Sequence, residues 1–359
     1  MASMDEPWQL RNGMMIPNRS VLAAMTNKQS HADGTLSEEE IQFLNRRAEG
    51  GFGLLTTAAS HVQESGQGWD GEFGVWGDHH IPGLTRLAST LNQHGTRSFV
   101  QIFHGGMRAP SSITGLQPSS ASENFISEKE GSSRAMSETE VEDTISCFIE
   151  AAKRCEEAGF DGVELHGAHG YLIAQFLGSN TNRRTDQFGG DVVERARFLL
   201  NIIRGIRQVV DETFAIMVRL SPVSDEIGIT LEDTKQVIEL LLEEQIDAIH
   251  ISCWDVFEKH EETTITKEIC ATFGSQIPII STGSVWTAKD AQFVLDQGAQ
   301  AVGVARVALP HPEWATHVAN VEYEPTRPPF TEEQLLQADL SPTFVDYMRR
   351  WKGFVTDGR

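Results

Sequence analysis

The stretch "DGVELHGAHGYL" at residues 161–172 joins a predicted buried strand to a cluster of chemically active side chains. Its first half is a short apolar run, which favours a strand over residues 161–166. Its second half carries His166 and His169, followed at once by Gly170 and Tyr171. A buried strand that ends in polar side chains is typical of the carboxyl edge of a parallel sheet, where such sheets place their sites. We therefore expect this strand to be one of a series.

Similar apolar runs recur between residues 20 and 320, and each is followed by a segment with helical periodicity. This alternation predicts parallel βα units. Eight units within this range predict a single closed (β/α)8 barrel, with an open doubly wound sheet as the alternative. The strand candidates span residues 21–25, 53–59, 98–103, 161–166, 214–220, 247–252, 278–282 and 301–305.

The pattern divides the chain into an N-terminal segment at 1–19, a barrel at 20–320 and a C-terminal extension at 321–359. Residues 8–19 hold turn residues between short apolar stretches, which predicts a hairpin that closes the bottom of the barrel. The long segment at 105–134 follows the third strand and predicts a lid over the site. The extension contains several aromatic residues that need a place to pack, so we expect it to be folded.

Composition narrows the class of protein. The chain has 359 residues and a formal net charge of −22, which repels a phosphate backbone and disfavours nucleic acid as a partner. No apolar run approaches the roughly 18 residues of a membrane span. The N-terminus lacks the basic and apolar segments of a secretion signal, so we expect a cytoplasmic protein. Four cysteines without metal-type spacing are assigned no chemistry.

His166, His169 and Tyr171 are the strongest candidates for catalysis. Two imidazole N–H groups can hold one substrate oxygen while negative charge develops on it. A phenol has a pKa of about 10, so Tyr171 can donate a proton to a carbanion formed beside that oxygen. Two alternatives remain: the histidines could bind a metal, or only hydrogen-bond to backbone. No third ligand stands at a suitable spacing, so we predict no metal site.

Other predicted strands also end in polar residues at the same rim. Gln101 is near the end of the third strand, where its amide could bind the edge of a flat heterocycle. Arg219 ends the fifth strand and could serve either an ion pair or the site. The segments 281–285 and 303–309 follow the last two strands, where barrels bind phosphate through backbone N–H groups. With Arg306, they predict a phosphate site.

The run "HGAHGYLIAQFLGSNTNRRTDQFGGDVVERARF" at residues 166–198 resembles the Old Yellow Enzyme family of FMN-dependent ene-reductases. The similarity extends over about residues 17–312. It implies FMN at the carboxyl face of the barrel, reduced by NADH or NADPH and reoxidised by an electron-poor alkene. His166 and His169 would then hold the substrate oxygen and Tyr171 would protonate the adjacent carbon. The implied FMN-binding residues are Ala24, Met25, Thr26, Ala59, Gln101, Arg219, Gly283, Ser284, Ala305 and Arg306.

In detail the chain looks most like a bacterial subgroup that includes the xenobiotic reductases. Thr26 stands where that subgroup often has cysteine, which implies no redox tuning by a thiol. Lys28 replaces a substrate-contacting tyrosine, so we expect it to bind substrate and favour an anionic one, or else to point to solvent. A C-terminal arginine of that subgroup can reach a neighbouring subunit. Arg349 and Arg350 are candidates here, and a homo-oligomer is one expectation.

Two other functions stay open at the level of sequence. The chain could be a flavin-binding barrel without efficient alkene turnover, acting as a sensor or scaffold. It could also be a phosphate-binding barrel enzyme that uses no flavin. An assay of NADPH consumption with enones separates the first alternative from an ene-reductase, and the colour of the purified protein separates the second.

Overall fold

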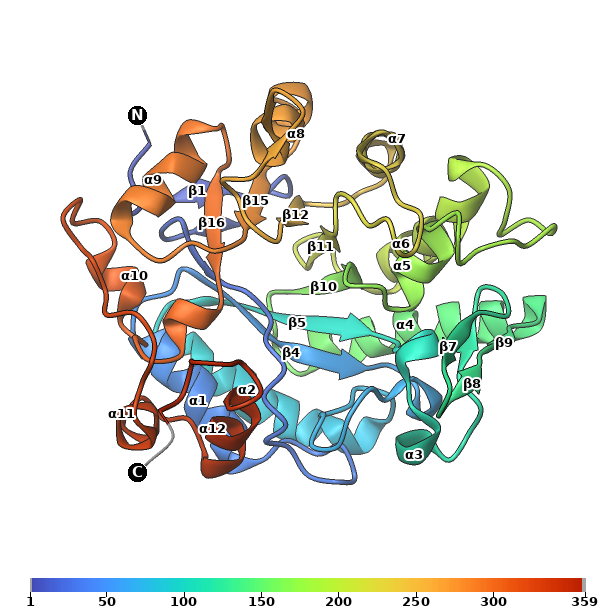
Figure 1. Ribbon diagram of the computed structural model, residues 1–359, viewed down its shortest axis with the longest axis horizontal. Coiled ribbons are helices and arrows are strands. Elements are labelled where there is room, and N and C mark those ends of the chain that lie inside the picture. The colour runs from blue at the N-terminus through green and yellow to red at the C-terminus, as the bar shows by residue number, and fades with distance from the viewer. Residues whose placement is uncertain (1, 357–359) are drawn as a thin grey trace.

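A computed structural model describes residues 2–356. Its centre is a closed barrel of eight parallel strands surrounded by helices (Figure 1). The predicted (β/α)8 barrel is confirmed, and the open sheet is wrong because β16 pairs with β3 and closes the circle. In order around the barrel the strands are β3 (Ser20–Leu22), β4 (Leu54–His61), β5 (Arg97–Phe103), β10 (Gly162–Gly167), β11 (Ala215–Leu220), β12 (Ala248–Ser252), β15 (Ile279–Thr282) and β16 (Ala301–Val304).

The strand register sets which polar residues meet inside the barrel. Gln101 of β5 is opposite Glu164 of β10. Two residues further along β10, His166 is opposite Arg219 of β11, which in turn is opposite His250 of β12. Because all eight strands run in the same direction, their carboxyl ends meet at one rim and bring these residues together.

Side-chain caps explain where the surrounding helices begin. The side chains of Ser137, Asp191, Thr230 and Thr287 each accept a hydrogen bond from a backbone N–H of the first helical turn. The backbone N–H of each of these residues donates in return to the side chain three positions later. This reciprocal arrangement satisfies N–H groups that the helix leaves free. The outer helices are α1 (Glu38–Glu49), α2 (Ile81–Asn92), α4 (Glu138–Glu157), α6 (Val192–Val209), α7 (Leu231–Glu243), α8 (Ile265–Phe273), α9 (Ala288–Asp296) and the short α10 (Trp314–His317).

The N-terminal residues close the amino end of the barrel. Strand β1 (Trp8–Gln9) pairs antiparallel with β2 (Met15–Ile16). Trp8 and Ile16 form one buried cluster with Phe99 and Met217 from the barrel interior. We call this cluster of Trp8, Ile16, Phe99, Met217 and their buried apolar neighbours the apolar plug. Burial of apolar surface contributes about 25 cal/mol per Å², so the apolar plug stabilises the end of the barrel opposite the polar rim.

The segment at 105–134 forms small elements beside the rim. They are α3 (Ser111–Thr114) and the strands β6 (Ser119–Ser120), β7 (Phe125–Ser127), β8 (Gly131–Ser132) and β9 (Arg134–Ala135), and the hairpin β13 (Lys259–His260) with β14 (Thr263–Thr264) follows later in the chain. From this segment, Met107 and Arg108 reach the central cavity. The lid expected over 105–134 thus contributes two side chains to the cavity.

The C-terminal extension packs on the barrel and reaches the same rim. Its helices are α11 (Glu332–Gln337) and α12 (Pro342–Met348), drawn in red beside α1 in Figure 1. The Phe344 ring meets the Phe43 ring of α1 edge-on, with centroids 5.1 Å apart. This contact brings Tyr347 and Trp351 to the cavity. Within residues 2–356, no helix combines the length and apolar character needed to cross a bilayer.

Candidate active site

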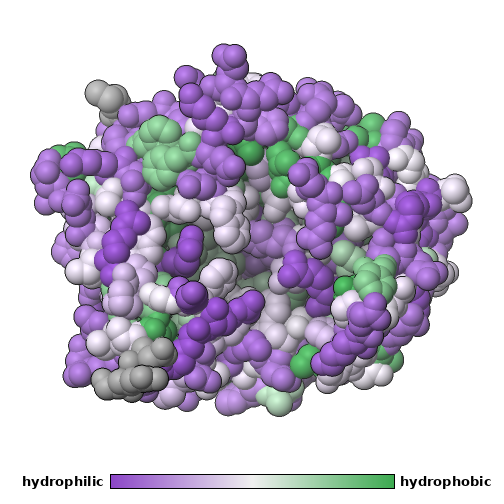
Figure 2. Space-filling model, viewed as in Figure 1, coloured by the Kyte–Doolittle hydropathy of each residue, from purple (hydrophilic) through white to green (hydrophobic). Residues whose placement is uncertain are grey.

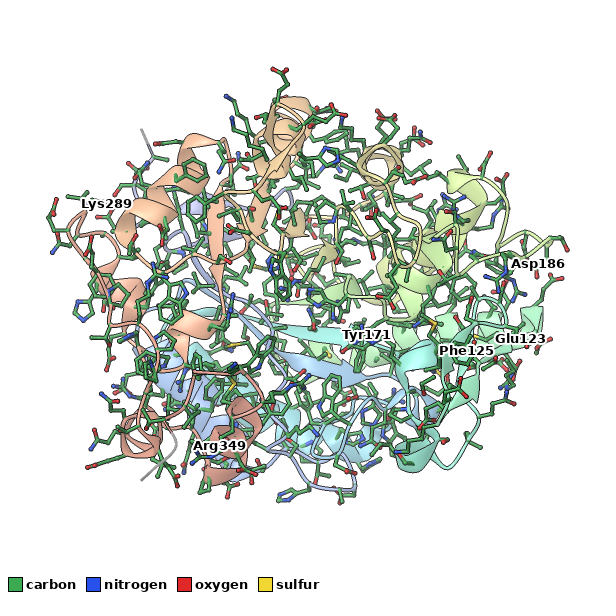
Figure 3. All side chains as sticks on the ribbon, in the orientation of Figure 1. Glu123, Phe125, Tyr171, Asp186, Lys289 and Arg349 are labelled. Carbon is green, nitrogen blue, oxygen red and sulfur yellow. The ribbon has the colours of Figure 1, made fainter. Side chains whose placement is uncertain are left out.

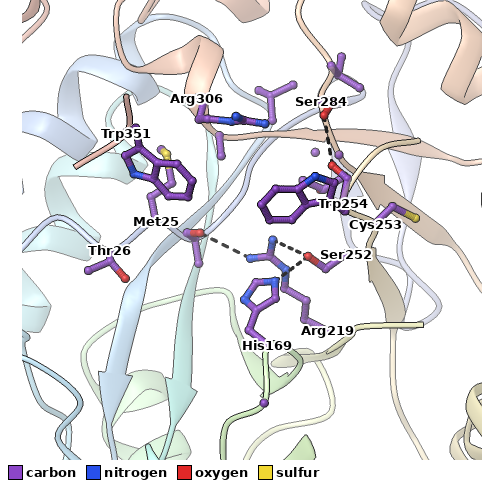
Figure 4. Close-up of a pocket in the computed structure, with 18 of the residues that line it drawn as sticks. Met25, Thr26, His169, Arg219, Ser252, Cys253, Trp254, Ser284, Arg306 and Trp351 are labelled. Atoms are coloured by element: carbon purple, nitrogen blue, oxygen red, sulfur yellow. Dashed lines mark hydrogen bonds between the residues drawn. The ribbon is translucent and has the colours of Figure 1, made fainter. Parts of the chain in front are cut away.

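A cavity of about 600 Å³ opens at the carboxyl rim of the barrel. This is the size of a small-molecule or cofactor pocket. Figure 2 shows the corresponding face as mostly hydrophilic with a recess near its middle, and Figure 4 shows the lining side chains. Nine of the predicted site residues line the cavity: Ala24, Met25, Thr26, His169, Arg219, Gly283, Ser284, Ala305 and Arg306.

His166, His169 and Tyr171 form a tight cluster of rings beside this cavity. The His166 ring centroid is 5.0 Å from that of His169 and 5.0 Å from that of Tyr171. His169 and Gly170 both have positive φ, at 57° and 71°, which turns the chain sharply as it leaves β10. Tyr171 then directly precedes α5 (Leu172–Leu177) and packs edge-on against Phe103. The turn is what gathers the three side chains.

The electrostatics of the cluster keep all three groups uncharged. Burial lowers the pKa of His166 well below its usual value, and the neighbouring His169 and Arg219 add to the effect. The protein packed around His169, followed by the charges of Arg219 and Arg108, lowers the pKa of His169 to about 3. One side of this residue remains open to the cavity. Burial raises the pKa of Tyr171. At neutral pH the site therefore offers two neutral imidazoles and a protonated phenol.

Ser252 links Arg219 to His169. The Arg219 Nη2 atom donates to the Ser252 hydroxyl at 3.1 Å, and that hydroxyl is 2.8 Å from His169 Nε2 (Figure 4). A serine hydroxyl can accept from the guanidinium and still donate its own proton, so that proton is available to Nε2 of the neutral imidazole. In the tautomer that accepts it, Nδ1 of His169 carries the ring proton and can donate it to a ligand. Ser252 was not predicted, although its place at the end of a strand is a signal for such a role.

The opposite end of the cavity is built from the loops after β15 and β16. Ser284 has a positive φ of 56°, and its hydroxyl donates to the Trp254 carbonyl at 3.1 Å. At Gly283 a Cβ atom would lie 2.7 Å from the Cys253 carbonyl oxygen, so only glycine fits there without displacement. Arg306 forms no ion pair with any residue from 2 to 356. This end thus presents backbone N–H groups and a free guanidinium.

Five predicted site residues do not line this cavity. Two of them, His166 and Tyr171, lie in the ring cluster beside it. Gln101 and Ala59 are adjacent in the register of β5 and β4 and are both buried in the barrel wall. Lys28 is half-buried, and its Nζ lies 5.7 Å from the ring centre of Tyr347. Conversely, sequence reasoning missed Trp254 and Trp351, which stand on the cavity wall with exposures of 80% and 40%.

Comparison with known proteins identifies the family. Residues 3–324 match the model of the NADH:flavin oxidoreductase / NADH oxidase family. The chain belongs to this family. It is therefore an NAD(P)H-dependent flavin oxidoreductase of the Old Yellow Enzyme type, and the alternative of a flavin-free barrel enzyme is wrong.

Individual relatives agree with the family assignment. A probable NADH-dependent flavin oxidoreductase of Bacillus subtilis is 35% identical over 323 residues, which cover 87% of each chain. An NADH:fumarate oxidoreductase of Klebsiella pneumoniae is 34% identical over 88% of this chain, but this chain spans only 36% of that longer protein. The structure of the Old Yellow Enzyme homologue from Zymomonas mobilis has a TM-score of 0.80 at 24% identity and covers 93% of this chain and 96% of that one, which supports the fold.

The residues of this member fit a flavin. Within residues 2–356, two buried polar atoms at the site, His166 Nδ1 and Arg219 Nε, have no hydrogen-bond partner. A buried polar group without a partner is costly, so these atoms are suited to a ligand. Arg306 and the backbone around Gly283 suit a phosphate at the far end. No group of three His, Cys, Asp or Glu side chains in the same range is arranged to hold a metal ion.

Proposed function

We propose that this protein binds FMN in the cavity and uses NADH or NADPH to reduce the C=C bond of electron-poor alkenes such as enones and nitroalkenes. The observation that carries the proposal is the cluster of two neutral imidazoles and one protonated phenol beside Arg219. Such a cluster can hold a carbonyl or nitro oxygen and protonate the neighbouring carbon.

The cofactor part of the proposal assigns residues to the two ends of FMN. Gly283, Ser284, Ala305 and Arg306 would hold the phosphate through N–H groups and a positive charge. The ring system would lie against Ala24, Met25, Thr26 and Ala59, with Gln101 and Arg219 at its pyrimidine edge. When bound, FMN supplies the hydride that reaches the β-carbon of the alkene.

The substrate part of the proposal rests on proton positions. In the tautomer whose Nε2 accepts from Ser252, His169 can donate to the substrate through Nδ1, and His166 contributes a second ring nitrogen. Donors that are already in place stabilise charge on the substrate oxygen without reorganisation. Tyr171 keeps its proton because burial raises its pKa, so its hydroxyl can deliver that proton to the α-carbon.

Cationic side chains lie over Tyr171 and over Tyr347, which lines the cavity, and they favour an anionic substrate. The Arg108 guanidinium carbon is 5.0 Å from the centre of the Tyr171 ring. Lys28 and Arg350 both lie over the ring of Tyr347, and Arg350 Nη1 donates to its hydroxyl at 2.9 Å. Within residues 2–356, none of the three cations forms a salt bridge, although Glu226 also lines the cavity. This arrangement suits alkenes that carry a carboxylate.

Replacing Tyr171 with phenylalanine tests the proposal. A general acid typically contributes about 10²–10⁴-fold, so Tyr171→Phe is expected to slow reoxidation by cyclohexenone at least tenfold. Reduction by NADH or NADPH is expected to stay near the wild-type rate, because no proton is delivered to an alkene in that step. Rapid-mixing measurements of flavin absorbance follow each half-reaction separately.

The same measurements separate the proposed function from its alternative. Equal slowing of both half-reactions would contradict the role of Tyr171. A wild-type protein that binds FMN and oxidises NAD(P)H, yet reduces no compound in a panel of enones and nitroalkenes, would favour the sensor or scaffold. A preparation that takes up no FMN would contradict the cofactor assignment.

A further inference from the structure

A fully buried polar layer lies inside the barrel, one level below the cavity. Its members are Gln101, Glu164 and His250, from β5, β10 and β12, and each is at most 2% exposed. Two residues earlier on β5 and β12, Phe99 and Ala248 belong to the apolar plug. The layer therefore separates an apolar floor from the polar rim. A charged group at such a depth is costly unless it is fully paired.

The layer is joined by three short hydrogen bonds. Gln101 Nε2 donates to Glu164 Oε1 at 2.6 Å, and Glu164 Oε2 is 2.6 Å from His250 Nδ1. His250 Nε2 is in turn 2.6 Å from the hydroxyl of Thr282, which lines the cavity. Glu164 thus stands at the centre of a continuous path from the cavity wall to Gln101.

The charge states within the layer follow from its contacts. Burial alone would raise the pKa of Glu164, but His250, Arg219 and Gln101 outweigh it and hold that pKa below its usual value. Burial lowers the pKa of His250, against the opposing effect of Glu164. The layer therefore holds a carboxylate and a neutral imidazole. His250 Nδ1 carries the ring proton and donates it to Glu164, while Nε2 accepts from Thr282.

The carboxylate fixes the orientation of the Gln101 amide. An ionised carboxylate can only accept hydrogen bonds, so the NH₂ group of Gln101 must face Glu164. The Gln101 oxygen then points away from Glu164 and makes no hydrogen bond with residues 2–356. A ligand above the layer therefore meets an acceptor at this position.

We propose that Glu164 is a positioning residue for the cofactor: it locks the Gln101 amide and places a buried negative charge next to Arg219. This proposal rests on the proposed binding of FMN over Gln101 and Arg219. Two effects follow. The locked amide strengthens FMN binding, and the negative charge offsets part of the positive charge of Arg219, which lowers the reduction potential of the bound flavin.

Substitution of Glu164 with glutamine tests both effects. Glu164→Gln keeps the shape, removes the charge and lets the Gln101 amide turn, since the new amide can donate as well as accept. We expect the midpoint potential of bound FMN, measured by anaerobic titration against a reference dye, to become more positive. The dissociation constant for FMN is expected to increase several-fold.

Glu72→Gln is the control for loss of a buried hydrogen bond between a glutamate and a histidine. Glu72 is also buried, with Oε1 at 2.8 Å from His61 Nδ1, but it bonds to neither Gln101 nor Arg219. Burial raises the pKa of Glu72 well above its usual value, so this variant removes the hydrogen bond and not a charge. This substitution is expected to leave the potential and the FMN affinity at wild-type values. A shift as large as that of Glu164→Gln would overturn the proposal, because any buried Glu–His pair would then have the same effect.

A second variant decides the question if Glu164→Gln does not fold. Glu164→Asp keeps the charge but withdraws the carboxylate from Gln101, so it should bind FMN more weakly at a potential near that of the wild type. Wild-type affinity in Glu164→Asp, or an unchanged potential in folded Glu164→Gln, would overturn the proposal. Failure of the wild-type protein itself to bind FMN would instead contradict the proposed function.

Discussion

The two imidazoles of the site are expected to stay neutral across the physiological pH range. Burial lowers the pKa of His166 and brings that of His169 to about 3, whereas a histidine in the unfolded chain has a pKa of about 6.5. The rate of flavin reoxidation by an enone should therefore show no break near pH 6.5 when measured between pH 5 and 8. A break near 6.5 that disappears in His169→Asn would contradict this assignment.

The same pKa shifts have a defined sign for stability. Because the folded-state values lie below the unfolded one, the unfolded chain binds more protons once the pH falls below about 6.5. The contribution of these histidines is complete above that pH and is lost as the pH falls toward the folded-state values. The fall in the thermal midpoint between pH 7 and pH 5 should accordingly be smaller in His169→Asn than in the wild type.

Individual residues differ in how far the sequence predicts them. His166, His169 and Tyr171 could be predicted because polar side chains directly follow an apolar run, and the end of a strand in a barrel is a fixed place. Glu164 and His250 interrupt apolar runs, and their roles depend on the register that makes them neighbours across β11. Trp351 depends on how the extension packs, for which the sequence offers no local signal.

At the level of elements, the eight strands were predicted to within about three residues because each is a short apolar run bounded by helical segments. The side-chain contacts between neighbouring strands were not predicted. In β16, for example, Gly303 lies beside Thr282, and a Cβ atom there would be 1.8 Å from the threonine hydroxyl and 3.1 Å from His250 Nε2. The absence of a side chain at Gly303 is what leaves room for the hydrogen bond between Thr282 and His250.

Gly303→Ala should therefore strain β16 and break the link between Thr282 and His250. Overpacking of this kind typically costs about 1–3 kcal/mol, which we expect as a loss in the free energy of unfolding measured with urea. Gly83→Ala in α2 is the matched control, because its Cβ would make an ordinary contact of 3.6 Å with Leu36. Alanine within a helix is favoured over glycine by roughly 0.5–1 kcal/mol, so that variant should be no less stable. Equal loss in both variants would contradict the packing argument.

At the level of the whole molecule, the cations over Tyr171 and Tyr347 contrast with a net charge of −22. A uniformly acidic surface would repel an anionic substrate, so unpaired cations at the site are needed to reverse the local field. Arg350 belongs to this group and lies over the ring of Tyr347. Its neighbour Arg349 instead pairs with Glu332 at 2.6 Å and stands at the periphery, away from Tyr171 (Figure 3).

Two substitutions of adjacent arginines can therefore separate a local field from overall charge. We expect Arg350→Gln to lower kcat/KM for 4-oxopent-2-enoate by roughly threefold to tenfold, since one charge near a solvated site contributes about 1 kcal/mol. Turnover of the methyl ester, which lacks the charge, should change little, and added salt should reduce the difference because it screens the field. Arg349→Gln removes the same charge from the chain and should leave the ratio of acid to ester unchanged. If both variants lower that ratio equally, net charge rather than the arrangement at Tyr171 and Tyr347 selects the substrate.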